Sequence, residues 1–259
     1  MLAKFGKWLV RHNEDVCNRI ESALPSRFTR SLLHAHELRA AAEIVSRTPP
    51  TRVLDIGGGR NSPFIDFLPA RELCTVIALD ILQTQIGANK SADLKIVGDV
   101  CGAVPLRDGS VEVVVTRSVL EHLRDPRAAV REIHRVLTAR GVCIHVFPAR
   151  FSPFSVLNRI IPDKIAHRLL FAFFPEWSGH CGFPAFYRYC DASAMAKIHT
   201  EAGLVVRSVE CRYYQSIYFK FFVPLYLLSL GYDLMMYWLN WPLLACQVLL
   251  AAEKHAPGL

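Results

Sequence analysis

Residues 52–64 decide the fold, and they read Arg52-Val53-Leu54-Asp55-Ile56-Gly57-Gly58-Gly59-Arg60-Asn61-Ser62-Pro63-Phe64. The aliphatic residues from Val53 to Ile56 predict a strand that is buried on both faces. Gly57 to Gly59 predict a tight turn, because residues without a Cβ allow unusual backbone angles and a close ligand approach. Asn61 and Ser62 before Pro63 predict a helix near residues 63–68, whose backbone N–H groups point back at the turn. Such a turn suits an anionic or carboxylate-bearing small molecule, but many α/β proteins use one as a plain connection.

Composition places the chain among folded globular proteins that lean apolar. It has 259 residues, of which 52% are hydrophobic and 20% charged. The 30 basic and 23 acidic residues give a net charge of +7, which suits nucleic acid, an anionic membrane surface or an acidic substrate. No basic run is interleaved with aromatic residues, which argues against sequence-specific binding of nucleic acid. The eight cysteines form no Cys-x-x-Cys pair, so we expect reduced thiols in a cytoplasmic protein and no zinc site.

Further along the chain, strand and helix patterns alternate. Apolar, β-branched runs predict strands at residues 74–80, 94–100, 111–116, 142–147, 204–210 and 245–254. This alternation favours a doubly wound α/β sheet with its ligand site at the carboxyl ends of the parallel strands. Asp80 ends the second strand, 21 positions after Gly59, where a carboxylate can accept both hydroxyls of a ribose or simply cap the strand. Asp99 can accept the exocyclic amine of an adenine, and Val100 offers an apolar ring contact.

Five ordered motifs together resemble the class I S-adenosylmethionine-dependent methyltransferases, especially the subgroup acting on small molecules and lipids. They are Leu54-Asp55-Ile56-Gly57-Gly58-Gly59, Ala78-Leu79-Asp80, Gly98-Asp99-Val100, Val119-Leu120-Glu121-His122-Leu123 with Asp125-Pro126, and Arg135-Val136-Leu137 before Arg140-Gly141. The resemblance covers about residues 50–148. It implies a Rossmann-like sheet of seven strands with the last antiparallel, and S-adenosyl-L-methionine as the cofactor. It also implies cofactor-binding residues: Gly57, Gly58 and Gly59 at the methionine part, Asp55 at its amino group, the backbone near Arg117 beside it, Asp80 and Ile81 at the ribose, and Asp99 and Val100 at the adenine.

Two positions depart from the pattern of these methyltransferases. The third glycine of the usual turn is missing, because Arg60-Asn61 follow Gly59; the turn should still form, with an altered approach to the helix. Relatives that bind a divalent ion near the Glu-His pair carry an acid three positions before the glutamate. Here that position is Ser118, so we expect no metal.

His122 is the candidate catalytic residue. If the acceptor of the methyl group is a hydroxyl, a base with a pKa near neutrality assists the transfer, and histidine is the side chain with that property. The alternative is a structural residue that fixes the turn into the next helix, and the sequence leaves both open.

Segments outside the sheet predict an N-terminal helical arm at residues 1–50 and two insertions in a methyltransferase domain at residues 51–259. The first insertion, residues 148–190, follows the fifth strand and is rich in Pro, Phe and Tyr, as expected of a lid over the acceptor. His180, Tyr187 and Arg188 are its candidate substrate contacts. The second, residues 213–242, is strongly apolar and predicts core, a dimer face or a peripheral contact with the inner face of a membrane. Residues 234–252 carry no charge, but Asn240, Pro242 and Gln247 argue against a transmembrane span.

Three functions remain as alternatives. The first is a methyltransferase acting on a small-molecule, lipid-linked or glycan-related acceptor. The second is a nicotinamide-dependent oxidoreductase, although the chain lacks a complete Gly-x-Gly-x-x-Gly and a Tyr-x-x-x-Lys dyad after the fifth strand. The third is an inactive, membrane-associated interaction module. Asp55, Asp80 and Asp99 argue against the third.

Overall fold

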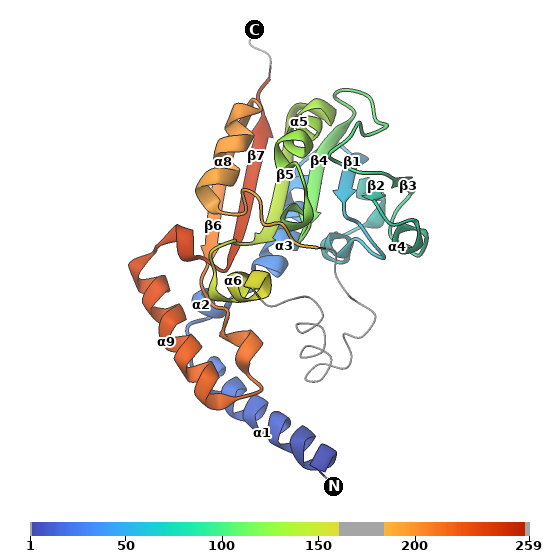
Figure 1. Ribbon diagram of the computed structural model, residues 1–259. Helices are drawn as coiled ribbons and strands as arrows, with labels where there is room; N and C mark the ends of the chain where they lie inside the picture. The colour runs from blue at the N-terminus through green and yellow to red at the C-terminus, as the bar shows by residue number, and fades with distance from the viewer. Residues whose placement is uncertain (1, 161–183, 257–259) are drawn as a thin grey trace.

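The computed structural model describes residues 2–160 and 184–256, and these fold around one seven-stranded sheet. The strand order is β3-β2-β1-β4-β5-β7-β6, and only β7 runs antiparallel to its neighbours (Figure 1). The strands are β1 Thr51–Ile56, β2 Cys74–Asp80, β3 Leu94–Val97, β4 Val111–Arg117, β5 Leu137–Pro148, β6 Leu204–Arg212 and β7 Gln247–Lys254. The predicted fold class is therefore confirmed. The third strand is shorter than predicted and the fifth is longer.

Helices cover both faces of the sheet (Figure 1). On one face lie α5 (Pro126–Val136) and α8 (Ala192–Glu201), which pack Ile133 and Met195 into one apolar core. On the other face lies α3 (Leu32–Val45), which packs Ile44 into a second core with β1, β4 and β5. Asp125 and Asp191 cap α5 and α8, since each accepts a hydrogen bond from a first-turn N–H.

The helix predicted after the glycine turn is only a 3₁₀ helix, η1 (Pro63–Phe67). Pro69 follows directly, and a proline disfavours helical geometry in the residue before it, so the run cannot lengthen. Ser62 makes no cap hydrogen bond. The sheet face beside β1 is covered instead by α3, which makes part of the predicted N-terminal arm integral to the core. The division at residue 50 otherwise stays a prediction.

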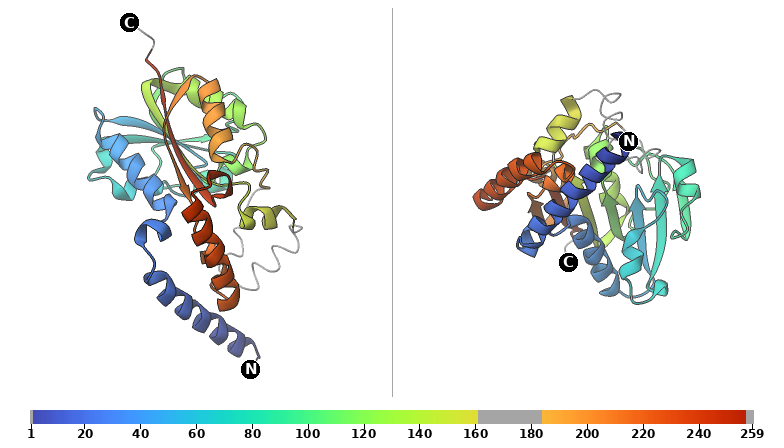
Figure 2. Two further views of the ribbon diagram at one scale, coloured as in Figure 1. Left: turned by 90° about the vertical axis from the view of Figure 1, so that its left-hand side faces the viewer. Right: turned by 90° about the horizontal axis from the view of Figure 1, so that it is seen from below.

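A third element of the fold joins the N-terminus to the second insertion. Helices α1 (Leu2–Ser22) and α2 (Ser26–Thr29) meet α9 (Val223–Leu239) around Cys17, Phe28, Tyr214, Tyr226 and Leu230. Figure 2 shows α1 and α9 extending together below the sheet. The uncharged residues 234–252 do not form one helix, because they are divided between the end of α9 and β7. The prediction that they are not a transmembrane span agrees with this division. No helix in the described ranges is long and apolar enough to cross a membrane.

Candidate functional site

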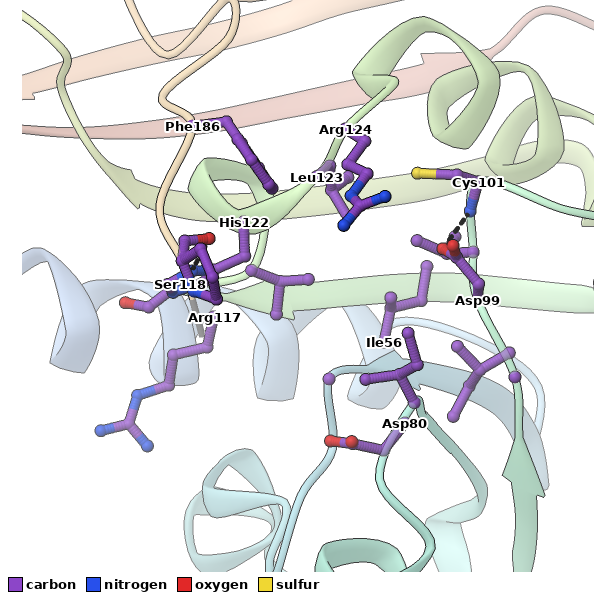
Figure 3. Close-up of a pocket in the computed structure, with 17 residues that line it drawn as sticks. Ile56, Asp80, Asp99, Cys101, Arg117, Ser118, His122, Leu123, Arg124 and Phe186 are labelled. Carbon is purple, nitrogen blue, oxygen red and sulfur yellow. Dashed lines mark hydrogen bonds between the residues drawn. The ribbon is translucent and has the colours of Figure 1, made fainter. Parts of the chain in front are cut away.

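A cavity of about 550 Å³ lies where β1, β2, β3 and β4 end, at the carboxyl edge of the sheet (Figure 3). Its lining comes from the four strand ends, from the turn after β4 and from two residues of the first insertion. These residues are Ile56, Gly57, Leu79, Asp80, Ile81, Gly98, Asp99, Val100, Cys101, Arg117, Ser118, Val119, His122, Leu123, Arg124, Pro184 and Phe186. The site is therefore at the place that the alternating pattern predicts, because the ends of parallel strands meet at one edge.

The glycine turn beside this cavity is held entirely by internal hydrogen bonds. Gly57 N and Gly58 N donate to the Leu79 carbonyl at 2.7 and 3.3 Å, and Gly59 N donates to Oδ2 of Asp80 at 3.1 Å. The backbone N–H groups of these three glycines are therefore all used within the protein. The turn instead fixes the end of β1 against the end of β2.

Glycine is required at the first position of the turn. Gly57 has φ +73°, and a Cβ there would lie 2.2 Å from Cγ2 of Val119. Gly59 also has a positive φ, at +41°. Sequence reasoning missed Asn89, whose buried amide donates to the Gly58 carbonyl at 2.8 Å and closes the turn from the other side. A single asparagine after a short helix carries no sequence signal for such a contact.

Asp55 lies beneath the turn and does not line the cavity. Its Oδ2 accepts a 2.5 Å hydrogen bond from the Ser62 hydroxyl, and its carboxyl is buried. Burial raises the pKa of Asp55 to about 7, although the Ser62 hydrogen bond lowers it. This carboxyl can therefore change its charge near neutral pH in response to a cation bound above it.

Of the other predicted cofactor residues, Gly58 and Gly59 do not line the cavity, whereas the rest do: Gly57, Asp80, Ile81, Asp99, Val100 and Arg117. Asp80 accepts from Leu82 N at 2.8 Å as well as from Gly59 N, so its carboxylate is held at the tip of β2. Asp99 Oδ1 accepts from Cys101 N at 2.8 Å. Arg117 lines the cavity at the end of β4, but its guanidinium lies 3.7 Å from Glu37 of α3 and extends away from the other labelled side chains (Figure 3). Only its backbone end is at the site.

His122 lies across the cavity from Asp80 (Figure 3). Its Nδ1 lies 3.2 Å from the Pro184 carbonyl, and a carbonyl only accepts, so Nδ1 carries the proton and the lone pair of the neutral ring is on Nε2. The ring is thus held in one tautomer by the first insertion. Glu121, its neighbour in sequence, is buried, and burial raises the pKa of Glu121 to about 8.

The first insertion closes the cavity through residues that sequence reasoning did not select. Phe186 N and Tyr187 N donate to the Glu121 carbonyl at 2.7 and 3.0 Å, and the Phe186 ring lies 5.8 Å from the Arg124 guanidinium carbon. Tyr187 is buried in the core and Arg188 donates to the Arg124 carbonyl at 2.9 Å; neither lines the cavity. The substrate contacts predicted for these two residues are not supported by this geometry, because the chain turns Phe186 inward instead. His180 lies outside the described residues.

Elsewhere in the described part of the chain, three buried side chains could together hold a metal ion. The ligand atoms of Cys143, His145 and His199 lie within 4.8 Å of one another, and none of the three residues lines the cavity. Burial lowers the pKa of both histidines, to about 4 for His199, so both rings are neutral at neutral pH. The absence of a metal beside Glu121 stays a prediction.

Comparisons with known proteins match the part of the chain that carries most of the cavity lining. A family model described as a methyltransferase domain matches residues 54–145, which span β1 to β5. A comparison with curated proteins finds no match.

Several solved structures share the fold. One is a geranyl diphosphate C-methyltransferase from Streptomyces coelicolor A3(2) in complex with Mg²⁺, geranyl diphosphate and S-adenosyl-L-homocysteine, with a TM-score of 0.55, 13% identity, and coverage of 86% of this chain and 81% of that one. A geranyl diphosphate methyltransferase in complex with GPP and sinefungin has a TM-score of 0.53 at 15% identity, covering 85% and 78%. The [4+2]-cyclase SpnF also has 0.53, at 16% identity, covering 85% and 81%. At these identities the likeness shows the fold alone.

Proposed function

We propose that this chain, whose residues 54–145 match a methyltransferase domain, is a class I S-adenosylmethionine-dependent methyltransferase. It transfers the methyl group to a small apolar acceptor, with lipid-linked and glycan-related molecules as the expected classes. The observation that carries the proposal is the composition of the 550 Å³ cavity. Carboxylates of Asp80 and Asp99 line one part of it, and Phe186, Pro184 and Leu123 line another. One cavity therefore offers a polar part suited to a nucleoside and an apolar part suited to an acceptor.

The residues at the strand ends fit S-adenosyl-L-methionine in size and chemistry. A volume of 550 Å³ lies within the range of about 300–1,000 Å³ that is typical of small-molecule sites. In our proposal Asp80 accepts the ribose hydroxyls with Ile81 beside it, Asp99 accepts the adenine amine, and Val100 packs on the adenine ring. Gly57 to Gly59 and the backbone of Arg117 flank the methionine part. Asp55 stabilises the amino group from beneath the turn.

When bound, S-adenosyl-L-methionine supplies a methyl group on a positively charged sulfur. The chain then has to align an acceptor with that methyl group and exclude water, and such positioning provides much of the rate enhancement. Phe186 and Pro184 are suited to this role, since the first insertion holds them over the cavity through the Glu121 carbonyl. We assign His122 as the base that accepts the acceptor's proton at Nε2, because its Nδ1–H is committed to Pro184.

The fold neighbours support a small-molecule acceptor but do not define it. Two of them are geranyl diphosphate methyltransferases. A third neighbour is a [4+2]-cyclase, so proteins with this fold do not all have the same activity, and function has to be argued from the site. The apolar lining contributed by Phe186 and Leu123 is this chain's own reason for an apolar acceptor.

Binding and transfer assays test the proposal. Calorimetry of the full chain should detect S-adenosyl-L-methionine but not NAD, and Asp80→Asn should weaken binding at least about tenfold, as expected for loss of a charge-assisted hydrogen bond. Asp66→Asn, at an exposed position of η1, is the matched control. Labelled methyl groups should then enter the organic phase of a lipid extract. Binding of NAD alone would favour the oxidoreductase, and cofactor binding without transfer to any extract would favour the inactive module.

A further inference from the structure

Helix α9 exposes an apolar face that the rest of the described chain leaves uncovered. Its inner face packs Tyr226, Leu230 and Met236 against the protein. Its outer face carries a second apolar stripe at helical spacing, with Leu228 74% and Trp238 83% exposed. We call the whole exposed surface the apolar rim, and it comprises Trp8, Leu9, Ile217, Tyr218, Phe222, Leu227, Leu228, Leu234, Met235, Trp238, Leu239, Trp241 and Leu243.

The one charged residue of α9 is turned away from this rim. Asp233 is fully buried, and its Oδ2 accepts from Gln215 N, Ser216 N and Ser216 Oγ at 2.8, 2.8 and 2.6 Å. A buried carboxylate needs such partners, so the network fixes which face of α9 points outward. As a result, the outward face of this 17-residue helix carries no charged side chain.

The rim lies at the same end of the molecule as the cavity. β7 begins at Gln247 opposite Pro148, the last residue of β5, so the chain before β7 lies at the carboxyl ends of the parallel strands. Helix α1 is tied to this region by Lys220, whose ammonium contacts Glu21 and donates to Asn18 at 2.8 Å. Figures 1 and 2 show α1 and α9 together beyond that edge of the sheet.

The sequence of α1 begins with basic residues, which suit anionic lipid headgroups. In the sequence of α1, Lys4, Lys7 and Arg11 occur before the first acid, Glu14, and the chain as a whole carries +7. Of the four tryptophans, Trp8, Trp238 and Trp241 belong to the rim. Tryptophan is enriched at bilayer interfaces, where its ring is amphipathic, and basic residues beside an apolar helical face are typical of helices that lie in that interface.

We propose that the apolar rim docks on the surface of an anionic phospholipid bilayer. Because the inner face of α9 is packed on the protein, only the outer face enters the interface, and the carboxyl edge of the sheet then faces the membrane. The cavity would receive an acceptor embedded in lipid. That last step rests on the proposed function, whereas the docking itself does not.

Vesicle sedimentation of the full chain tests the docking. Vesicles of phosphatidylcholine with phosphatidylglycerol should retain the protein at low salt, and vesicles of phosphatidylcholine alone should retain less. The double variant Leu228→Ser/Trp238→Ser should bind at least about tenfold more weakly, since each side chain loses its burial in the interface. The control is Leu94→Ser/Val97→Ser, which changes two apolar residues of the edge strand β3 that are each 55% exposed; this variant should bind like the unchanged protein.

Tryptophan fluorescence provides a second readout, because three of four indoles lie on the rim. Brominated lipids in the anionic vesicles should quench it. Protein that stays in the supernatant with both vesicles, or a rim variant that binds as well as the control, would overturn the proposal. The proposal would also be overturned if light scattering showed a dimer that the rim variant does not form, and the protein did not bind vesicles. Cofactor calorimetry on the same samples distinguishes this failure from failure of the proposed function, since the rim does not include the cavity lining.

Discussion

The hydroxyl of Ser62 donates a 2.5 Å hydrogen bond to Oδ2 of Asp55, and together they form a buried pair directly beneath the glycine turn. They are seven positions apart in sequence, and Ser62 directly precedes η1. The pair matters because burial raises the pKa of Asp55 to about 7, so the charge under the turn depends on pH in the physiological range.

We expect cofactor affinity to depend on the charge of Asp55. Without a ligand the carboxyl is protonated below about pH 7 and ionised above it. A cationic amino group above the turn favours the ionised form, so binding should tighten between pH 6 and pH 8 and should release a proton near pH 7. Calorimetry in buffers of different ionisation enthalpy measures that release. Asp55→Asn should bind more weakly and lose this part of the pH dependence, while the cofactor's own titration stays; identical pH profiles for the two proteins would contradict the assignment.

Gly57→Ala should destabilise the chain and weaken cofactor binding together. The new Cβ would lie 2.2 Å from Cγ2 of Val119, and the backbone has φ +73°, so both sterics and conformation oppose alanine. We expect a loss of more than about 1 kcal/mol in the free energy of unfolding, measured by urea denaturation. Gly87→Ala is the control, because nothing lies within 4 Å of a Cβ there. Adding Val119→Ala should restore part of the loss, and no restoration would show that the backbone angle alone is responsible.

Glu121 should make the fold less stable at alkaline pH. Burial raises its pKa in the folded chain to about 8, above its ordinary value of 4.5. The folded state therefore holds the proton more tightly than the unfolded state. Its carboxyl imposes no charge penalty at low pH. The contribution of Glu121 to the free energy of unfolding falls as pH rises from about 4.5, and this contribution is lost above about 8. The fall is of the order of a few kcal/mol.

Glu121→Gln keeps the shape of the protonated side chain and should remove that part of the fall. Urea denaturation at pH 5.5, 7 and 8.5 measures it as the difference between the two proteins. Asp55 also has a raised pKa, but it is present in both proteins, so its effect on stability cancels in the difference between them. Parallel stability profiles would mean that the carboxyl of Glu121 is not desolvated in solution.

His122→Asn separates a base from a structural residue. The asparagine amide can reproduce the donation to the Pro184 carbonyl that Nδ1 makes at 3.2 Å, but it cannot accept a proton. If His122 is the base, kcat for a hydroxyl acceptor should fall by about 10²–10⁴ and the acidic limb of the pH profile should disappear, with cofactor affinity unchanged. His122→Ala should be no worse in kcat. A structural role predicts instead that asparagine restores activity that alanine loses.

Individual elements show which features of the structure can be predicted from residues close together in the sequence. Buried strands were predictable because each is a continuous apolar run ending in polar residues, and Asp80 and Asp99 could be assigned to the cavity because they end such runs. The prediction of an α-helix after the glycine turn was wrong, since Pro69 limits it to a 3₁₀ turn and α3, which precedes β1 in the chain, covers that face. Tyr187 and Arg188 were selected for their chemistry, but it is the backbone bonds to Glu121 that turn Phe186 to the cavity.

The sequence by itself therefore determined the sheet, its order of motifs, the glycine turn and the edge at which the cavity lies, because strand burial and turn formation depend on residues close together in the chain. Tertiary structure alone decided three things: that the turn's N–H groups are used by Leu79 and Asp80, that Asp55 is buried beneath the turn, and that Asp233 is buried so that α9 shows an uncharged face. Each of these features depends on a hydrogen bond between a polar group and a partner in another segment of the chain. The spacing of residues within one segment does not predict such a bond.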